Sequence, residues 1–412
     1  METSENIADQ LRALLEEWAA FNATPGNGCT RLPFTKEARR AADCIRRRMV
    51  EAGLNVREDA AGNIIGVLPG EDTALPALAV GSHYDTVQNG GNFDGQAGIA
   101  VGILLARLLK QNGVRLKRTL AVVAFCDEEG MRFGTGYFGS KAMLGQITQE
   151  DLHHFRDKDD VSVYDAMKAY GLVPEKIGEA RQDLSKIAAF IEMHIEQGPV
   201  LDQNHEEIGL VECIVGIQRY VITVHGRADH AGTTPMDMRA DAMEAAAKVI
   251  AQLPDWARAE GDGTVATTGY CRAVPGGMNI IAGEVQFSVD VRSRCQTHID
   301  TVVSKLRAAL NTACSRDGVS WDMDCKLDVA PVDLSTSMLD LLEQSCQTHG
   351  YRFRRMISGA GHDALAIGQV LDTVMLFVPS KDGRSHCPAE WTEYADIAKA
   401  VHVLYDLVLA MQ

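Results

Sequence analysis

Apolar residues recur at two different spacings in the first third of the chain, and these spacings predict alternating helices and strands. Residues 35–53, TKEARRAADCIRRRMVEAG, repeat apolar positions at helical spacing and end on glycine, which is typical of a helix. The segments LNVREDAAGNIIGVLPG and ALPALAVGSH predict a pair of strands and then a buried strand. A helix over residues 98–109 and a buried strand within residues 119–130 continue the alternation. We therefore expect an α/β domain with a central mixed sheet flanked by helices, which binds ligands at the carboxyl ends of its strands.

The pattern changes over residues 216–329. The segments YVITVHG and EVQFSVDVRS alternate apolar and polar residues, as half-exposed antiparallel strands do. Two segments between and after them, ADAMEAAAKVIAQL and HIDTVVSKLRAALNTAC, have helical spacing, so the order resembles a split β-α-β, ferredoxin-like unit. The later segment DTVMLFVPS returns to a buried strand. We expect a discontinuous first domain, residues 1–215 and 330–412, interrupted by an inserted α+β domain at residues 216–329.

Composition narrows the range of functions. The apolar fraction of 46% and the charged fraction of 23% are those of a soluble globular protein. The net charge of -16 disfavours a nucleic-acid partner, because an acidic surface repels phosphates. The chain starts with acidic residues instead of the basic segment of a signal peptide, and no apolar run has the length of a membrane span. We therefore expect a cytoplasmic location. The ten cysteines form no CxxC pair, which favours reduced thiols over a disulfide framework or a thiolate zinc site.

Side chains that ligate metals gather in the glycine-rich loop GSHYDTVQNGGNFDG, which follows a predicted strand. His83 can ligate a metal while Asp85, two residues later, orients its ring. Asp94 could ligate one ion or bridge two. On these residues alone, the aspartates could equally be turn formers.

Three further segments place similar side chains after or near the ends of predicted strands. In CDEEG, one of the adjacent carboxylates Glu128 and Glu129 could ligate a metal and the other could act as general base, although a solvated acidic turn is the alternative. His194 lies in IEMHIEQGPVL and His386 in VPSKDGRSHCPAEW. A single histidine of this kind is usually structural, but four such clusters at strand ends favour a metal centre.

Seven motifs, in this order, resemble those of one enzyme family: GSHYDTVQNGGNFDG, DEEGMRFG, EMHIEQGPVL, DHAGTTPM, MNIIAGEVQFSVDVR, SGAGHDA and SHCPAEW. The family is that of the binuclear-metal amidases, hydantoinases and carbamoylases, a branch of the aminoacylase-like metallopeptidases. This branch includes N-carbamoyl-L-amino-acid hydrolases, allantoate amidohydrolases and β-ureidopropionases. The resemblance extends from about residue 31 to residue 412.

The resemblance implies two divalent metal ions per subunit. It assigns as metal ligands the residues His83, Asp94, Glu129, His194 and His386, with Asp94 bridging. It makes Glu128 the general base that passes a proton from water to the leaving nitrogen, and Asp85 the residue that orients His83. Nitrogen and oxygen ligands without a thiolate suit zinc or manganese, and cobalt and nickel are also acceptable.

The resemblance also implies a small anionic ureido substrate and a homodimer. His230 matches a histidine that stabilises the tetrahedral intermediate in the partner subunit's site, whereas by itself it would be interpreted as a turn residue. Arg292 and Asn279 match positions that hold the substrate carboxylate, and a core arginine paired with Asp290 is the alternative for Arg292. Other pocket positions are matched by Gln197, Arg219, Gly359 and His362.

These observations predict a metal-dependent amidohydrolase that cleaves the ureido C–N bond of N-carbamoyl-L-amino acids, releasing amino acid, CO2 and ammonia. An allantoate amidohydrolase or β-ureidopropionase would use the same mechanism on another substrate. A dipeptidase or aminoacylase is a more distant alternative, which Arg292 and Asn279 disfavour. An inactive metal-bound binding module is disfavoured because it would have no need of Glu128. The inserted domain is expected to serve for dimerisation and as a lid.

Overall fold

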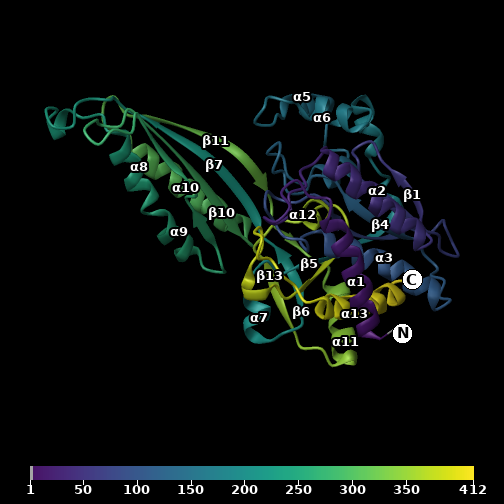
Figure 1. The fold of residues 1–412 in the computed structure, drawn as a ribbon. Coiled ribbons are helices and arrows are strands. Elements are labelled where there is room, and N and C mark those ends of the chain that lie inside the picture. The colour runs from purple at the N-terminus through teal and green to yellow at the C-terminus, as the bar shows by residue number, and fades with distance from the viewer. Residues whose placement is uncertain (1–2) are drawn as a thin grey trace. The chain divides into compact units, whose positions relative to one another are not determined.

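The computed structural model describes residues 3–412, and the chain divides into two compact units. The first unit contains the chain up to Glu212, together with Asp333–Ser358 and His362–Gln412. The second unit contains Cys213–Val332 and Gly359–Gly361. Each unit has its own sheet, and both can be followed in Figure 1. The functional domains expected from the sequence, with the inserted domain at residues 216–329, remain a prediction.

A nine-stranded mixed sheet forms the framework of the first unit. Its order is β1-β2-β4-β3-β5-β14-β6-β12, and β13 pairs with β6. The strands are β1 (Asn55–Glu58), β2 (Ile64–Leu68), β3 (Ala77–His83), β4 (Leu120–Phe125), β5 (Ile187–Ile195), β6 (Ile208–Ile214), β12 (Val332–Asp333), β13 (Phe353–Ser358) and β14 (Thr373–Val378). The central strands β4, β3, β5 and β14 are parallel, whereas β1, β2 and β6 pair antiparallel with their neighbours. Because parallel strands end at the same edge of a sheet, the loops after the four central strands meet there.

Helices flank this sheet. The α-helices of the first unit are α1 (Ser4–Ala19), α2 (Lys36–Glu51), α3 (Gln96–Gln111), α4 (Phe138–Met143), α5 (Gln149–His154), α6 (Val163–Tyr170), α7 (Val200–Asn204), α11 (Thr336–His349), α12 (Asp363–Ile367) and α13 (Tyr394–Ala410). The 3-10 helices of the chain are η1 (Pro174–Ala180), η2 (Leu184–Lys186), η3 (Met236–Met238) and η4 (Lys381–Gly383). Helix α3 packs on β3, β4 and β5, with α1 and α13 packed against it, while α2 packs on β1 and β2.

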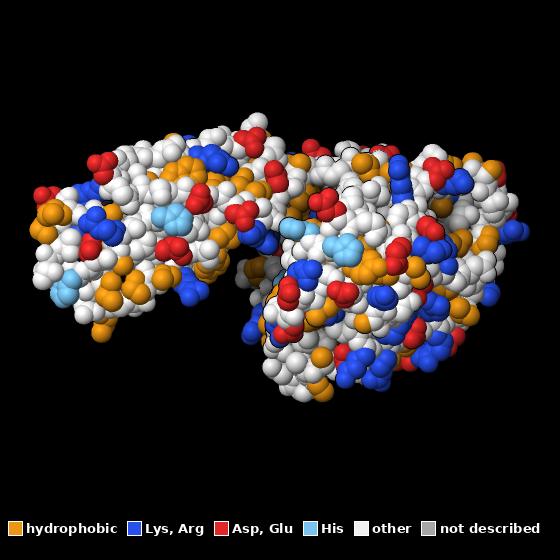
Figure 2. Space-filling model, turned by 90° about the horizontal axis from the view of Figure 1, so that it is seen from above, with side chains coloured by type: hydrophobic (Ala, Val, Ile, Leu, Met, Phe, Trp, Pro, Cys, Tyr) orange, Lys and Arg blue, Asp and Glu red, His pale blue; other side chains and the backbone are white. Residues whose placement is uncertain are grey.

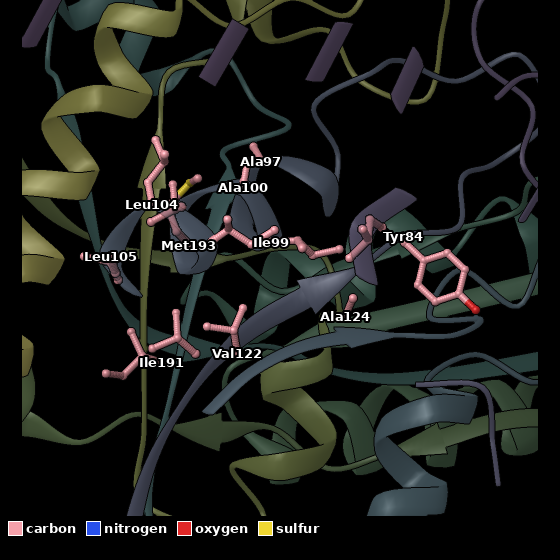
Figure 3. Close-up of a cluster of buried hydrophobic side chains, with 14 of the residues drawn as sticks. Tyr84, Ala97, Ile99, Ala100, Leu104, Leu105, Val122, Ala124, Ile191 and Met193 are labelled. Atoms are coloured by element: carbon pink, nitrogen blue, oxygen red, sulfur yellow. The ribbon is translucent and has the colours of Figure 1, made fainter. Parts of the chain in front are cut away.

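Helix α3 is apolar along most of its length because it is buried between the sheet and other helices. Figure 3 shows side chains of α3, among them Ile99 and Leu104, in one cluster with Val122 of β4 and Met193 of β5. Gly98 permits the close approach, because a Cβ atom at this position would lie 2.4 Å from the carbonyl oxygen of Met193. The helix is therefore held directly against the strands that end at the candidate site.

The second unit has a five-stranded antiparallel sheet with the order β11-β7-β10-β8, and β9 also pairs with β10. Its elements are β7 (Gly216–His225), α8 (Ala242–Ile250), α9 (Leu253–Glu260), β8 (Val265–Thr267), β9 (Cys271–Val274), β10 (Glu284–Ser293), α10 (Gln296–Ala313) and β11 (Ser320–Val329). Alternate residues of β10 are buried, including Phe287 and Val289, which pack in one cluster with residues of α8 and α10. The predicted mixed α/β fold with a central sheet flanked by helices is confirmed.

Some local expectations differ from the structure. The strand expected within residues 119–130 ends at Phe125, because Asp127 and Gly130 have φ values of 60° and 62° and turn the chain. The short helices α4, α5 and α6 were not expected. On the face seen in Figure 2, acidic and basic side chains are interspersed, although the chain carries a net charge of -16. Among residues 3–412, no helix combines the length and apolar character needed to cross a membrane.

Candidate metal and substrate site

Four parallel strands of the first unit bring histidine and acidic side chains to one edge of the sheet. His83 is the last residue of β3, and His194 is the last but one of β5. Glu128 and Glu129 follow β4, and His386 lies in the segment after β14. The parallel pairing of β3 with both β4 and β5 places these strand ends side by side.

Asp94 lies at the centre of this cluster. Its Oδ1 atom is 3.3 Å from His83 Nε2 and 3.0 Å from His194 Nε2, and its Oδ2 atom is 3.2 Å from His386 Nε2. Three sets of ligand atoms each lie within 4.8 Å of one another: His83, Asp94 and His194; His83, Glu128 and Glu129; and Asp94, Glu129 and His386. The five predicted ligands are thus brought together, and Asp94 belongs to two of the sets.

The loop that carries Asp94 is shaped by Gly95 and held by residues that follow β14. Gly95 has a φ value of 68°, and a Cβ atom there would lie 2.5 Å from the His83 ring, so glycine is required. Glu390 Oε1 accepts hydrogen bonds from the backbone N–H groups of Phe93 and Asp94, at 3.0 and 3.2 Å. Ser385 donates to both Asp94 and Glu390. Sequence reasoning missed Glu390 and Ser385, because a glutamate and a serine near His386 carry no pattern of their own.

The two buried histidines present Nε2 to the centre. His194 Nδ1 donates to the Ile195 carbonyl oxygen at 2.9 Å, and the Gly95 N–H group donates to His194 Nε2 at 3.2 Å. Likewise, His83 Nδ1 lies 3.2 Å from the Asp85 carbonyl oxygen. With the proton on Nδ1, the lone pair of each ring is at Nε2, the atom that can ligate a metal.

Asp85 links the ligand loop to the two glutamates. Its carboxylate lies 3.7 Å from His83 Nδ1. The same carboxylate accepts hydrogen bonds from the backbone N–H groups of Glu128 and Glu129, at 3.0 and 3.2 Å. Its predicted orienting role therefore has a geometric basis that extends to the glutamate pair.

The carboxylates of the cluster have displaced pKa values. Burial raises the pKa of Glu128 well above its usual range, with the charges of Glu129 and Asp363 adding and that of His83 opposing. Burial and then the charge of Asp94 raise the pKa of Glu129 to about 7. Burial would also raise the pKa of Asp94, but the neighbouring histidines, His194 first, hold it well below its usual range.

The donor set fits a divalent cation. Glu129 Oε1 is buried and accepts no hydrogen bond from the described residues, as expected of an atom that binds a metal. The other donors are imidazole nitrogens and carboxylate oxygens, without a thiolate. Such donors suit zinc, manganese, cobalt or nickel.

Two predicted substrate-binding residues lie beside this cluster. Gln197 donates through Nε2 to Asp94 Oδ2 at 2.7 Å, and the same nitrogen is 3.2 Å from His386 Nε2. The His362 ring lies 4.4 Å from the His194 ring, centroid to centroid. Burial and then the charge of His194 lower the pKa of His362 well below its usual range, so its ring is neutral at pH 7.

Arg219, Arg292 and Gly359 come together in the second unit. They line a cavity of about 490 Å³ with Val265, Thr267, Gly269, Ser288 and Asp290. Both arginines pair with Asp290, Arg219 at 2.9 Å and Arg292 at 2.8 Å, and Arg292 Nη1 donates to the Gly359 carbonyl oxygen. The arginines are paired with Asp290, but their side chains are 46% and 29% exposed, so Arg292 is not a core residue.

His230 and Asn279 form a separate exposed group in the second unit. Residues His230 and Ile280 form an isolated β-bridge, and the Ala231 N–H group donates to the Asn279 carbonyl oxygen at 2.9 Å. His230 Nδ1 accepts hydrogen bonds from the N–H groups of Gly232 and Thr233, at 3.0 and 3.2 Å. An Nδ1 atom that accepts carries no proton, so the neutral ring has its N–H at Nε2.

Sequence reasoning also missed Glu192. Its carboxylate accepts from Ser82 Oγ at 2.7 Å and from the Ala364 N–H group at 2.8 Å, and it thereby joins β3, β5 and α12. Glu192 precedes His194 by two residues in β5, so both side chains lie on the same face of the strand. The two-residue spacing of Glu192 and His194 in the motif EMH was the sequence feature that could have identified Glu192.

Comparison with known proteins places this geometry in a family. The model of the family described as "Peptidase family M20/M25/M40" matches residues 79–410. An N-carbamoyl-L-amino-acid amidohydrolase of Paenarthrobacter aurescens is 40% identical over 404 residues, which cover 98% of each chain. An allantoate amidohydrolase of Escherichia coli (strain K12) is 37% identical, covering 94% of this chain and 93% of that protein. The crystal structure of a hydantoinase/carbamoylase family amidase from Burkholderia multivorans has a TM-score of 0.86 at 30% identity, over 98% of this chain and 97% of that one.

The similarity covers both the ligands and the second unit. The family match contains all five predicted metal ligands, from His83 to His386. The named relatives are amidohydrolases, so the resemblance read from the motifs is confirmed. The chain belongs to peptidase family M20/M25/M40.

Proposed function

We propose that this protein is a metal-dependent amidohydrolase that cleaves the ureido C–N bond of N-carbamoyl-L-amino acids. The observation that carries the proposal is the convergence of the four other predicted ligands on Asp94, with the buried carboxylate of Glu128 in the same cluster. Relatives with 40% and 38% identity over nearly the whole chain are N-carbamoyl-L-amino-acid amidohydrolases. Such similarity over the full length supports the same chemistry in this chain.

Two divalent ions, zinc or manganese, are proposed for the cluster. His83, Asp94 and His194 would hold one ion, and Asp94, Glu129 and His386 the other. When bound, such ions lower the pKa of water and polarise a carbonyl oxygen. Glu128 is not needed in either set, which leaves its carboxylate to take a proton from water and pass it to the leaving nitrogen.

The substrate carboxylate is proposed to bind at Arg292 and Arg219. Both guanidinium groups are oriented by Asp290 and partly exposed to the same cavity. A fixed guanidinium pairs with a carboxylate through two parallel hydrogen bonds. Allantoate also carries a carboxylate, and an allantoate amidohydrolase is 37% identical to this chain, so allantoate is the second candidate substrate.

A homodimer with His230 acting in the partner subunit's site is also proposed. The Nε2–H group of His230 is the kind of donor that stabilises a developing oxyanion. Large apolar side chains are exposed in the same part of the chain: Met236, Met238, Met278 and Ile280, at 63%, 63%, 105% and 40%. A second copy would cover them. We propose a cytoplasmic location, which the ten free cysteines support.

The test measures ammonia release by the zinc- or manganese-loaded protein from N-carbamoyl-L-amino acids, their D-enantiomers, N-carbamoyl-β-alanine, allantoate and dipeptides. The proposal expects turnover of N-carbamoyl-L-amino acids. It also expects Glu128→Gln to lower kcat by about 10²–10⁴-fold while metal content stays unchanged. Turnover of allantoate alone would replace the substrate and keep the mechanism, whereas no turnover by the metal-loaded protein would refute the proposal.

A further inference from the structure

A cavity of about 280 Å³ lies in the first unit, away from the metal ligands. It is lined by Gly53, Leu68, Pro69, Lys110, Val114, Arg115, Leu116 and Arg118, and we call it the basic cavity. Arg118 lies just before the start of β4, and Glu128 follows the end of the same strand. A six-residue strand spans roughly 20 Å, so the basic cavity and the metal cluster lie at opposite ends of β4.

The charge of the basic cavity is opposite to that of the whole chain. The net charge is -16, yet three lining residues are cationic and none is acidic. Within residues 3–412, no carboxylate oxygen lies within ion-pair distance of the Lys110, Arg115 or Arg118 side chain. Three unpaired cations around one cavity repel one another, so a bound anion would stabilise them.

One of the cations is held in place, and the position of a second is defined by a nearby glycine. Arg118 donates through Nε to the Met411 carbonyl oxygen and through Nη1 to the Pro76 carbonyl oxygen, which fixes the plane of its guanidinium group. Lys110 Nζ lies over Gly53, since a Cβ atom at Gly53 would be 2.4 Å from it. Arg118 therefore presents its Nη2 group at a fixed orientation, as carboxylate binding requires.

The remaining wall is apolar and rests on a fixed backbone. Leu68, Pro69, Val114 and Leu116 contribute carbon surface. The Glu71 and Asp72 N–H groups donate to the carbonyl oxygens of Leu116 and Lys117, which holds the segment before β4 against the preceding loop. An anion with a short apolar body would contact both the cationic and the apolar side chains of the cavity, whereas an inorganic anion would contact only the cationic ones.

We propose that the basic cavity is a second ligand site, which binds a small carboxylate with an uncharged apolar body. The carboxylate would contact Lys110, Arg115 and Arg118, and the apolar body would lie on Leu68, Val114 and Leu116. A free amino acid fits less well, because its ammonium group would be repelled by the three cations.

Hexanoate is the test ligand, and calorimetric titration measures its binding to the metal-loaded protein. We expect a dissociation constant on the order of 1 mM, as befits a ligand of this size. Hexanamide and 6-aminohexanoate should bind at least about tenfold more weakly, because one lacks the negative charge and the other adds a positive one. Equal binding of hexanamide would overturn the proposal.

Variants that reverse the charge of lining residues test whether hexanoate binds in the basic cavity. The double variant Lys110→Glu/Arg115→Glu should lose one hexanoate site and keep its amidohydrolase activity. Lys117→Glu is the matched control, since Lys117 is an exposed cation of the same segment that does not line the cavity. Unchanged hexanoate stoichiometry in the double variant would show that any bound hexanoate sits elsewhere and would overturn the proposal.

A third measurement uses the unaltered protein and therefore does not depend on the folding of any variant. Hexanoate should slow acetylation of Lys110 by an amine-reactive ester at least about threefold, as followed by mass spectrometry of peptides, and leave Lys117 unaffected. Equal rates at Lys110 with and without hexanoate would refute binding in the basic cavity. Neither this measurement nor the titration depends on which substrate the metal centre hydrolyses.

Discussion

The orientation of Asp94 depends on Glu390, which lies 296 positions later in the chain. Glu390 accepts the backbone N–H groups of Phe93 and Asp94 on one oxygen and the Ser385 hydroxyl on the other. Ser385 in turn donates to Asp94. The central carboxylate is thus oriented through both its backbone and its side chain, although Glu390 belongs to none of the three ligand sets.

Glu390→Gln should weaken metal binding by about 10–100-fold, because the groups behind a ligand set its orientation. Competition with a chelator measures the affinity, and thermal unfolding of the metal-free protein separates this effect from general destabilisation. Glu393→Gln is the control, since Glu393 is an exposed carboxylate that accepts from Trp391 Nε1. Unaltered metal affinity in Glu390→Gln would contradict the positioning role.

Arg292→Lys should raise KM by about 10–100-fold for substrates with a carboxylate, since one ammonium cannot replace a bidentate guanidinium. Steady-state ammonia release measures this change. For an N-carbamoyl amino-acid amide, which lacks the carboxylate, Arg292→Lys and the unaltered protein should have the same KM. Arg294→Lys is the matched control, because Arg294 is exposed and does not line the cavity that contains Arg219 and Arg292. A similar rise in KM for the amide would indicate a structural effect.

At the scale of elements, helix α3 joins the core to the site. Its N-terminus follows Gly95 directly, and its side chains pack on the strands that carry His83 and His194. The sequence predicted this helix and the strand before it, because their apolar runs are long and uninterrupted. It left the grouping of the ligands open, because the parallel pairing of β3, β5 and β14 joins segments more than a hundred residues apart.

Gly98→Ala should lower the free energy of unfolding by about 1–3 kcal/mol, because the added methyl group would meet the Met193 carbonyl oxygen and push α3 from the sheet. Denaturation in urea measures the change. Gly178→Ala is the control, because a Cβ atom there meets nothing within 4 Å. Equal unfolding free energies of the two variants would show that the helix adjusts without cost.

The turn between β1 and β2 gives a pH-dependent contribution to stability. Burial raises the pKa of Asp59 to about 6, against hydrogen bonds from Asn63 and Ala61 that lower it. Because the pKa of Asp59 is higher in the folded than in the unfolded protein, its protonation stabilises the fold at pH values below the ordinary pKa of aspartate. This contribution is lost as the pH rises through about 6. The loss amounts to about 3 kcal/mol at most.

Asp59→Asn should therefore flatten the pH dependence of the unfolding free energy between about pH 4 and 6, because asparagine does not titrate in this range. Urea unfolding at several pH values gives the slope. Asp9→Asn, at an exposed position of α1, serves as the control and should leave the slope unchanged. An unchanged slope in Asp59→Asn would contradict the assignment.

At the scale of the whole molecule, the residues fall into groups on two units. The metal cluster, Gln197 and His362 lie in the first unit, whereas the two arginines, His230 and Asn279 lie in the second. Motif order predicted both sets. The anchoring roles of Glu390 and Glu192 could not be predicted, because each contacts segments that only the folded sheet brings together.

Mixing two inactive variants tests whether His230 acts in the partner subunit's site. A homodimer that exchanges subunits between His230→Ala and Glu128→Gln gains one intact site in each mixed dimer. Random exchange at equal amounts should restore about a quarter of the unaltered activity. Sedimentation shows whether dimers are present. Dimers that exchange subunits without recovering ammonia release would place His230 in its own subunit's site.

The spread of the ligands along the chain also sets when the centre can assemble during synthesis. His194 emerges from the ribosome before residues 213–332 of the second unit, and His386 only after them. At usual translation rates, these 120 residues take on the order of 10 s to make. During that interval the nascent first unit offers His83, Asp94 and His194 to the cell without their final partner. The candidate set of Asp94, Glu129 and His386 is therefore completed only after the second unit has been made, whereas His83, Asp94 and His194 are all present before it.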